Sequence, residues 1–362
     1  MSGQDSLETI RARIDALDEQ LVKLISERAR CAQAVAGVKR AGDPRAEFYR
    51  PDREARILRR IQEMNPGPLD DEEMGRLFRE IMSACLALEE PLKVAFLGPE
   101  GTFTQAAALK HFGHSVTTVP LGAIDEVFRE VESGAAHYGV VPVENSAEGV
   151  VTHTLDRFMQ SPLSICGEVA LRIHHQLLAA EPMERIRIER VYSHQQSLAQ
   201  CREWLDANLP QAERIPVSSN AAAARRAAQE KGVAAIASEA AAERYGLHTI
   251  NANIEDSPDN TTRFLVIGPN ASGPSGQDKT SLLLSTSNRP GSLFRLLEPF
   301  ARADVSLTRI ESRPSHCVNW DYVFFIDVEG HENDDKVRKA IEAVRKEADL
   351  VKVLGSYPRA VL

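Results

Sequence analysis

The sequence lacks the features that would send it to a membrane, a secretory pathway or nucleic acid. No apolar run approaches the roughly 20 residues that span a bilayer. The N-terminal residues have neither the basic nor the apolar region of a signal peptide. The formal net charge of −9 offers no basic face to a polyanion. We therefore expect a cytoplasmic protein that binds neither membranes nor nucleic acid.

Cysteine is scarce, and its spacing excludes the usual disulfide and zinc patterns. The chain has no Cys-x-x-Cys pair, only the scattered Cys31, Cys85, Cys166, Cys201 and Cys317. This spacing favours reduced thiols. The neighbouring His174 and His175 would point to opposite faces of a strand, which argues against a shared metal. We expect no metal and no other cofactor.

The length of 362 residues is enough for two or three domains. Arg and Lys are concentrated in residues 11–60 although the chain is acidic overall, and this local excess suits a small anionic substrate. Local patterns divide the chain into three modules. A helical module covers residues 1–91 and an α/β module covers 92–271. A linker of small residues then leads to an α+β module at 278–362.

Residues 1–91 show helical periodicity throughout. Apolar residues recur at helical spacing from Leu7, and Gly42 ends a pattern of about 36 residues, or roughly 54 Å of helix. Two shorter helices are expected near residues 51–64 and 70–90. A helix this long extends beyond a small domain, so its apolar face needs a second chain to cover it. This predicts an intertwined dimer.

Three cations of the long helix are candidates for binding an anion. Arg28 and Lys39 lie about three turns apart and project from one face. Arg11 lies off that face, about 25 Å before Arg28, so one small substrate cannot touch both ends. If all three bind it, Arg11 must come from the partner chain. The ordinary alternative is three solvated charges on an exposed helix.

Together with Arg53-Glu54, these cations resemble the all-helical chorismate mutases. Those enzymes are intertwined dimers that rearrange chorismate to prephenate without a covalent or acid–base step. The resemblance implies a chorismate site made of Arg11, Arg28, Lys39, Arg53, Glu54 and Glu89. Lys39 and Glu89 would donate to the ether oxygen, where charge develops as the bond breaks. A carboxyl group donates only when protonated, so Glu89 is predicted to be buried with a raised pKa.

Residues 92–271 alternate short apolar strands with helices. This predicts two α/β lobes with a cleft between them, the first lobe completed by the strand at 262–267. Residues 98–104 lack the Gly-Lys-Ser/Thr of a P-loop, so nucleotide binding is not expected. Three polar clusters lie at strand–helix junctions or strand starts: Glu144-Asn145-Ser146, Ser193-His194-Gln195 with Gln200, and Asn260–Phe264. Each cluster taken alone is typical of a helix cap or a turn. Together the three clusters predict a ligand-binding site in the cleft.

The runs Val-Pro-Val-Glu-Asn-Ser and Thr-Arg-Phe, with Pro-Glu-Gly-Thr-Phe at 99–103, resemble prephenate dehydratases. These fold as two lobes like solute-binding proteins and remove carbon dioxide and hydroxide from prephenate, giving phenylpyruvate. The resemblance implies prephenate contacts from Thr102, Glu144, Asn145, Ser146, Ser193, Gln200, Thr262 and Arg263. Thr262 would be the essential donor to the leaving hydroxyl, by hydrogen bonding or by proton relay. Arg263 would either clamp a carboxylate or support its strand, and His194 would have a structural role.

The last module has the element order βαββαβ, which is ferredoxin-like. Its turn-rich segments 288–293 and 308–314 resemble the two effector motifs of the ACT domains that follow prephenate dehydratases. Those domains bind phenylalanine where two of them pair. The resemblance implies an effector site made of Gly291, Ser292, Leu293, Glu311, Ser312, Arg313 and Pro314. Feedback inhibition by L-phenylalanine is the implied role.

These resemblances cover nearly the whole chain and identify a member of the bifunctional chorismate mutase–prephenate dehydratase family. The implied partners are chorismate, prephenate, L-phenylalanine and a second copy of the chain, with higher assemblies left open. One rival is an amino-acid-responsive regulator, which the presence of Asn145 and Thr262 disfavours. A second rival keeps the dehydratase and uses residues 1–91 only for dimerisation, which Arg11, Arg28 and Lys39 disfavour.

Overall fold

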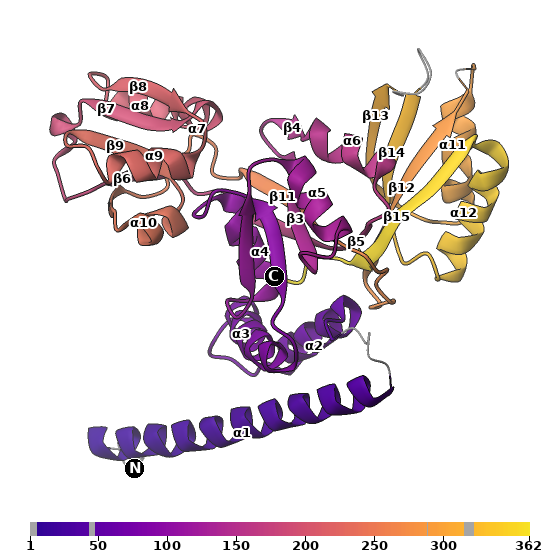
Figure 1. The fold of residues 1–362 in the computed structure, drawn as a ribbon, viewed down its shortest axis with the longest axis horizontal. Coiled ribbons are helices and arrows are strands. Elements are labelled where there is room, and N and C mark those ends of the chain that lie inside the picture. The colour runs from indigo at the N-terminus through magenta and orange to yellow at the C-terminus, as the bar shows by residue number, and fades with distance from the viewer. Residues whose placement is uncertain (1–5, 43–47, 288, 315–321) are drawn as a thin grey trace, which may run out of the picture.

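The computed structural model describes residues 6–42, 48–287, 289–314 and 322–362. Asn288, which opens the first effector segment, and Cys317 lie outside these ranges. Figure 1 shows a long helix along the bottom, one α/β lobe in the middle, a second α/β lobe at the upper left and a sheet with two helices at the upper right. Within the described ranges, none of the helices combines the length and apolar character that crossing a membrane requires.

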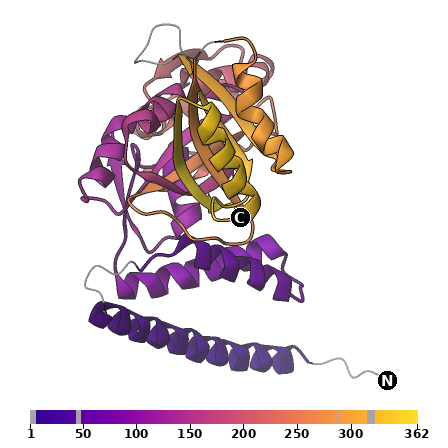
Figure 2. The ribbon, with the colours of Figure 1, turned by 90° about the vertical axis from the view of Figure 1, so that its right-hand side faces the viewer.

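The helical module contains α1 (Leu7–Gly42), α2 (Pro51–Met64) and α3 (Asp71–Glu89). Helix α1 has 36 residues, as predicted. It extends well beyond α2 and α3, and both views leave its N-terminal half apart from the rest of the chain (Figures 1 and 2). Ala36 is its one buried residue, whereas Leu17 is 50% exposed and Leu24 is 63% exposed. Much of its apolar face is therefore uncovered by the described part of a single chain.

The first lobe is a sheet in the order β2-β1-β3-β11-β5, with β4 paired to β3. Its elements are β1 (Lys93–Leu97), α4 (Phe103–Phe112), β2 (Thr117–Leu121), α5 (Ile124–Glu132), β3 (Tyr138–Asn145), β4 (Gly149–Val150), α6 (Thr152–Gln160), β5 (Ser164–Arg172) and β11 (Thr261–Gly268). The late strand β11 completes this sheet, as predicted. The sequence pattern predicts a strand over residues 138–143, and β3 continues two residues further because β11 pairs with it as far as Asn145.

The second lobe is a sheet in the order β10-β6-β9-β7-β8. Its elements are β6 (Gln176–Ala179), β7 (Arg190–His194), α7 (Gln195–Gln200), α8 (Arg202–Asn208), β8 (Glu213–Val217), α9 (Asn220–Ala227), β9 (Val233–Ala237), α10 (Glu239–Tyr245) and β10 (His248–Asn251), with a short 3-10 helix at Arg185–Arg187. The sequence pattern predicts one helix over residues 196–208, but the structure divides it at Cys201, whose φ of −116° is not helical. The short edge strand β10 was not predicted.

The C-terminal module has the predicted βαββαβ order. It contains β12 (Asp278–Thr286), α11 (Ser292–Arg302), β13 (Leu307–Pro314), β14 (Tyr322–Glu329), α12 (Asp335–Glu347) and β15 (Leu350–Pro358). The four strands form an antiparallel sheet in the order β13-β14-β12-β15. Both helices pack on one side of this sheet (Figures 1 and 2), and the other side faces the first lobe.

The C-terminal module and the first lobe share a hydrophobic core. Leu283, Phe325 and Leu354 of the module belong to the same cluster of buried side chains as Phe128 and Phe158 of the lobe. Strand β15 lies against β5 so closely that a β-carbon on Gly355 would come within 2.1 Å of the carbonyl oxygen of Ile165. The two backbones can approach each other this closely only because residue 355 is a glycine and has no side chain.

Candidate active sites

A cavity of about 580 Å³ lies among the three helices of the first module, and we call it the helical cavity. Its lining brings together Arg28, Lys39, Arg53, Glu54 and Glu89, which come from α1, α2 and α3. Arg11 does not line it and lies on the exposed N-terminal half of α1. This placement agrees with the argument that one straight helix cannot present Arg11 and Lys39 to the same small molecule.

Glu89 sits beside the cations of α1 at the end of this cavity. Burial raises the pKa of its carboxyl group, although Lys39, Arg28 and Arg40 act in the opposite direction. The direction of the shift is the predicted one, but Glu89 is half-buried rather than fully buried. The guanidinium of Arg40 donates to the backbone oxygen of Glu89, and this contact ties the end of α1 to the end of α3.

Arg79 of α3 is a functional neighbour that the sequence analysis missed. Its Nη1 donates to Glu54 Oε1 at 2.5 Å and also to the backbone oxygen of His111 in α4. Burial raises the pKa of Glu54, while Arg79 and Arg28 lower it. Arg79 thus fixes Glu54 in the helical cavity and joins it to the first lobe. A lone arginine on a helix carries no sequence signal for such burial.

In the α/β lobes, strands β3 and β11 place Asn145 opposite Thr262. The side-chain oxygen of Asn145 accepts from the backbone N–H groups of Ala147 at 2.9 Å and Glu148 at 3.2 Å. These contacts fix the orientation of the amide, so its nitrogen donates to Thr262 Oγ1 and to Asn260 Oδ1, both at 2.8 Å. No described residue accepts the hydroxyl hydrogen of Thr262. That hydrogen is available to a ligand.

A chain of side-chain amides continues from this pair into the second lobe. Asn260 Nδ2 donates to Gln200 Oε1 at 3.1 Å, and Gln200 Nε2 donates to Glu148 Oε1 at 3.0 Å. His175 Nε2 also bonds Gln200 Oε1, at 2.9 Å. Burial lowers the pKa of His175, so a neutral ring donates this bond. The sequence analysis missed His175 and Glu148 because neither belongs to a polar cluster at the end of a predicted strand.

The remaining polar residues of the predicted clusters differ in their surroundings. Ser146 is exposed and its hydroxyl accepts from the N–H of Thr261 at 2.9 Å. Thr102 caps α4 by accepting from the N–H of Gln105. Ser193 was predicted to touch the substrate, but it is fully buried, with its hydroxyl 2.8 Å from the Ile236 oxygen. This hydrogen bond ties β7 to β9. His194 caps α7 through Nδ1, in keeping with a structural role.

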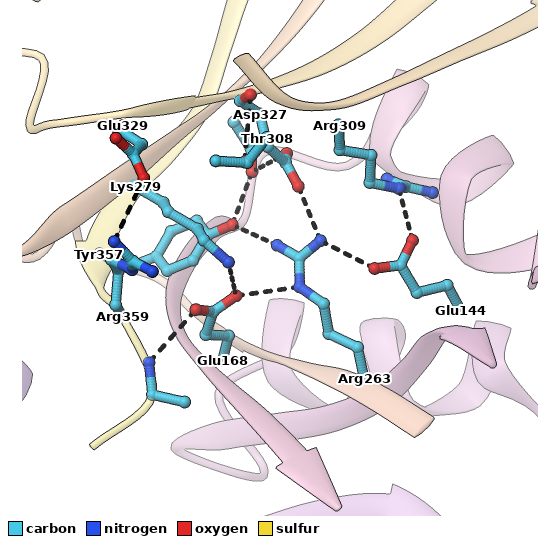
Figure 3. A network of polar contacts seen from close by, with 12 residues as sticks. Glu144, Glu168, Arg263, Lys279, Thr308, Arg309, Asp327, Glu329, Tyr357 and Arg359 are labelled. Carbon is cyan, nitrogen blue, oxygen red and sulfur yellow. Dashed lines mark hydrogen bonds and ion pairs between the residues drawn. The ribbon is translucent and has the colours of Figure 1, made fainter. Parts of the chain in front are cut away.

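Glu144 and Arg263 were also predicted to contact the substrate, and they line a cavity of about 380 Å³ together with Asn145 and Ser146. Neighbouring residues of a strand point to opposite faces, so Arg263 points away from the side that carries Thr262. Its Nη1 lies 2.7 Å from Asp327 Oδ2, and Glu144 Oε2 accepts from Arg309 Nε at 2.7 Å (Figure 3). Both partners belong to the C-terminal module. These contacts hold Arg263 on its strand, while its side chain also lines the cavity beside Asn145 and Ser146.

The two predicted effector segments lie at the same end of the C-terminal sheet. Strands β12 and β13 both run antiparallel to β14 and are therefore parallel to each other. Gly291, at φ +79°, precedes α11, and Ser292 is buried with its hydroxyl on the Ser287 oxygen at 2.9 Å. Arg313, at the end of β13, donates to Asp156 of the first lobe at 2.9 Å. Strand β14 separates the two segments within one chain.

Comparisons with known proteins cover the whole chain. Family models described as chorismate mutase type II, prephenate dehydratase and ACT domain match residues 10–90, 94–272 and 280–346. A bifunctional chorismate mutase/prephenate dehydratase from Stutzerimonas stutzeri is 60% identical over 365 residues, covering 100% of both chains. The Escherichia coli K12 protein of the same description is 32% identical over 384 residues, covering 99% of this chain and 97% of its own.

Solved structures resemble the part of the chain that follows the helical module. Prephenate dehydratase from Arthrobacter aurescens in complex with L-Phe has a TM-score of 0.69 and 36% identity, covering 74% of this chain and 90% of that one. A structure described as a quorum quenching acylase also scores 0.69, at 28% identity, covering 74% of this chain and 98% of that one. A shared fold therefore does not decide the activity. The identity over the full length does decide the family, and this chain belongs to the bifunctional chorismate mutase/prephenate dehydratases.

Proposed function

We propose that this chain catalyses two consecutive reactions of L-phenylalanine biosynthesis. The helical module rearranges chorismate to prephenate, and the two α/β lobes convert prephenate to phenylpyruvate. The observation that carries the second activity is the Asn145–Thr262 pair, which offers a free hydroxyl hydrogen beside an oriented amide. We place the module boundaries at residues 1–91, 92–271 and 278–362, and the enzyme in the cytoplasm, where scattered cysteines stay reduced.

The mutase reaction needs little from the protein beyond positioning and charge. Arg28 and Arg53 of the helical cavity hold the two carboxylates of chorismate in a reactive conformer, joined by Arg11 of a second copy. Lys39 and protonated Glu89 donate to the ether oxygen, on which negative charge develops. The exposed apolar face of α1 supports the pairing of two chains, because a second copy would cover it and bring Arg11 to the site.

The dehydratase reaction breaks two bonds of prephenate and forms an aromatic ring. The ring carboxylate leaves as carbon dioxide, its bonding electrons enter the ring, and the ring hydroxyl leaves with the C–O electrons. Thr262 donates a hydrogen bond to this hydroxyl, and Asn145 Nδ2 stabilises the charge that builds on Thr262 Oγ1. Asn260, Gln200 and Ser146 surround the pair and orient the substrate.

L-phenylalanine inhibits the dehydratase through the C-terminal module, in our proposal. The ligand binds Gly291, Ser292 and Leu293 together with the segment Glu311–Pro314, where two copies of the module pair. The exposed side chains of Leu293, Phe294 and Ile310 support such pairing, since they offer apolar area near both segments. Pairing through both α1 and this module would build assemblies larger than a dimer.

Product formation by the purified chain tests this function. We expect prephenate to appear from chorismate, and phenylpyruvate from added prephenate, with only the second reaction requiring the α/β lobes. L-phenylalanine should lower the rate of phenylpyruvate formation. Absorbance assays of the two reactions, run with and without phenylalanine, measure these rates. Binding of phenylalanine without any turnover of prephenate would instead support an amino-acid-responsive regulator.

Glu89 predicts a specific pH dependence of the mutase reaction. Only the protonated carboxyl donates, so activity should fall as pH rises through the raised pKa of Glu89. Glu89→Gln should remove this fall, because an amide donates at every pH. Initial rates of chorismate consumption across pH measure the effect, with Glu90→Gln, the neighbouring acid, as the matched control. A Glu89→Gln profile that follows the parent's would refute the donor role.

A further inference from the structure

A buried group of charged side chains joins the first lobe to the C-terminal module, and we call it the junction network. Figure 3 shows it converging on Arg263 from both sides. The lobe contributes Arg263, Glu144 and Glu168, and the C-terminal module contributes a matching set: Lys279, Arg309, Asp327 and Tyr357. Because these contacts are confined to one side of β3 and β11, they are separate from the Asn145–Thr262 pair.

All three guanidinium nitrogens of Arg263 make contacts within the junction network. Its Nε lies 2.9 Å from Glu168 Oε2, its Nη1 lies 2.7 Å from Asp327 Oδ2, and its Nη2 lies 2.9 Å from the Tyr357 hydroxyl. Burial alone would lower the pKa of Arg263, but Tyr357, Asp327 and Glu168 outweigh it and raise the pKa. The guanidinium therefore stays charged, and its partners hold it between the first lobe and the C-terminal module.

The charges of the junction network balance only when the two parts are docked. Arg263 and the two carboxylates of the lobe sum to one negative charge. Lys279, Arg309 and Asp327 of the C-terminal module sum to one positive charge. Buried charges are costly unless they are paired, so a shift of the module must be accompanied by rearrangement of the lobe's side chains.

The junction network is one peptide bond away from the residues proposed to act on prephenate. Glu144 precedes Asn145 in β3, and Arg263 follows Thr262 in β11. On the other side, Arg309 and Glu311 are two residues apart in β13 and share a face. Arg309 Nη2 is buried and has no partner among the described residues, so the Arg309–Glu144 pair leaves one donor unsatisfied. Because Nη2 has no contact to lose, a change of position costs Arg309 its ion pair with Glu144 and no contact of that nitrogen.

We propose that the junction network carries the inhibitory signal: an effector bound at Glu311–Pro314 moves Arg309, which pulls on Glu144 and displaces Asn145 from Thr262. This inference rests on the proposed dehydratase function and its inhibition by phenylalanine. Arg309 and Glu144 are positioning residues in this scheme, since neither touches the substrate. Linkage requires that the effector then binds less tightly when prephenate occupies the site.

Arg309→Gln tests the route because it removes the ion pair to Glu144 without touching the Asn145–Thr262 pair. We expect the phenylalanine concentration for half-inhibition to rise about tenfold or more. Phenylalanine affinity, measured by calorimetry on the full-length variant, and chorismate mutase activity should stay at the parental values. Arg338→Gln is the matched control, since Arg338 pairs with Asp335 on exposed helix α12. Arg309→Lys keeps the charge and should show a smaller shift.

A double-mutant cycle separates the pair from other routes. Glu144→Gln should also weaken inhibition by phenylalanine. The double variant with Arg309→Gln should weaken it little more than either single variant, because each single change already breaks the contact. Inhibition of Arg309→Gln at the parental concentration overturns the proposal, as does loss of phenylalanine binding, which would place Arg309 in the effector site. A parent that does not turn over prephenate refutes the proposed function instead, and the two failures are thus distinguishable.

Discussion

Thr262→Ala is expected to slow phenylpyruvate formation from prephenate by roughly 10²–10³-fold, the usual effect of removing one donor aimed at developing charge. The substitution removes the hydroxyl that Asn145 orients at 2.8 Å and leaves the backbone pairing of β3 and β11 intact. Stopped assays of phenylpyruvate measure the loss. Chorismate mutase activity of the same variant, made by a separate module, should be unchanged and reports correct folding.

The neighbouring threonine provides the control. Thr261 has the same side chain on the other face of the strand, where its hydroxyl bonds the Asp259 oxygen at 3.4 Å. Thr261→Ala should therefore keep most of the dehydratase activity. Thr262→Ser keeps the hydroxyl and should recover much of what Thr262→Ala loses. Equal rates for Thr262→Ala and the parent would remove Thr262 from the reaction.

Lys39→Ala is expected to slow the rearrangement of chorismate by roughly 10²-fold or more, because it removes a cationic donor from the ether oxygen. The ammonium group lines the helical cavity and lies 5.4 Å from the ring centre of Phe48. Chorismate consumption measures the loss. Lys23→Ala is the control, since Lys23 is on the same helix, is exposed and pairs only loosely with Glu19 at 3.8 Å.

Mixing variants tests whether Arg11 acts from a second copy. Arg11→Ala and Lys39→Ala should each be inactive as mutases. Chains of the two kinds that are unfolded and refolded together should regain roughly a quarter of parental activity, because half the dimers are mixed and each keeps one intact site. No recovery, with dimers present, would mean that Arg11 and Lys39 serve the same chain.

Periodicity predicted most elements of the fold. The 36 residues of α1 follow from one long apolar repeat, and β11 could be placed in the first lobe although it lies far along the chain. The errors occurred where the local signal is weak. Strand β10 is short and largely polar. The break at Cys201 lies where Asp256, from a later loop, accepts from the backbone N–H groups of Glu203 and Trp204 at the start of α8. Neither feature leaves a mark in hydrophobic spacing.

The candidate sites were predictable to the extent that their residues cluster along the chain. Asn145 and Thr262 belong to such clusters, whereas Arg53, Glu54 and Glu89 of the helical cavity were named through the family resemblance. Alternation along β11 already places Arg263 and Thr262 on opposite faces of the strand, which the sequence analysis did not use. Arg79, Asp327 and Tyr357 had no such signal. Their roles come from contacts between modules that are far apart in sequence.

The absence of a side chain at residue 355 has a consequence for how the chain denatures. Because β15 touches β5 backbone to backbone and their side chains share one core, neither part can melt without exposing apolar surface of the other. Cooperative units of unfolding follow shared cores rather than sequence boundaries. The dehydratase lobe that carries Thr262 and the C-terminal module should thus denature in a single transition. Deleting the C-terminal module should therefore destabilise the first lobe as well.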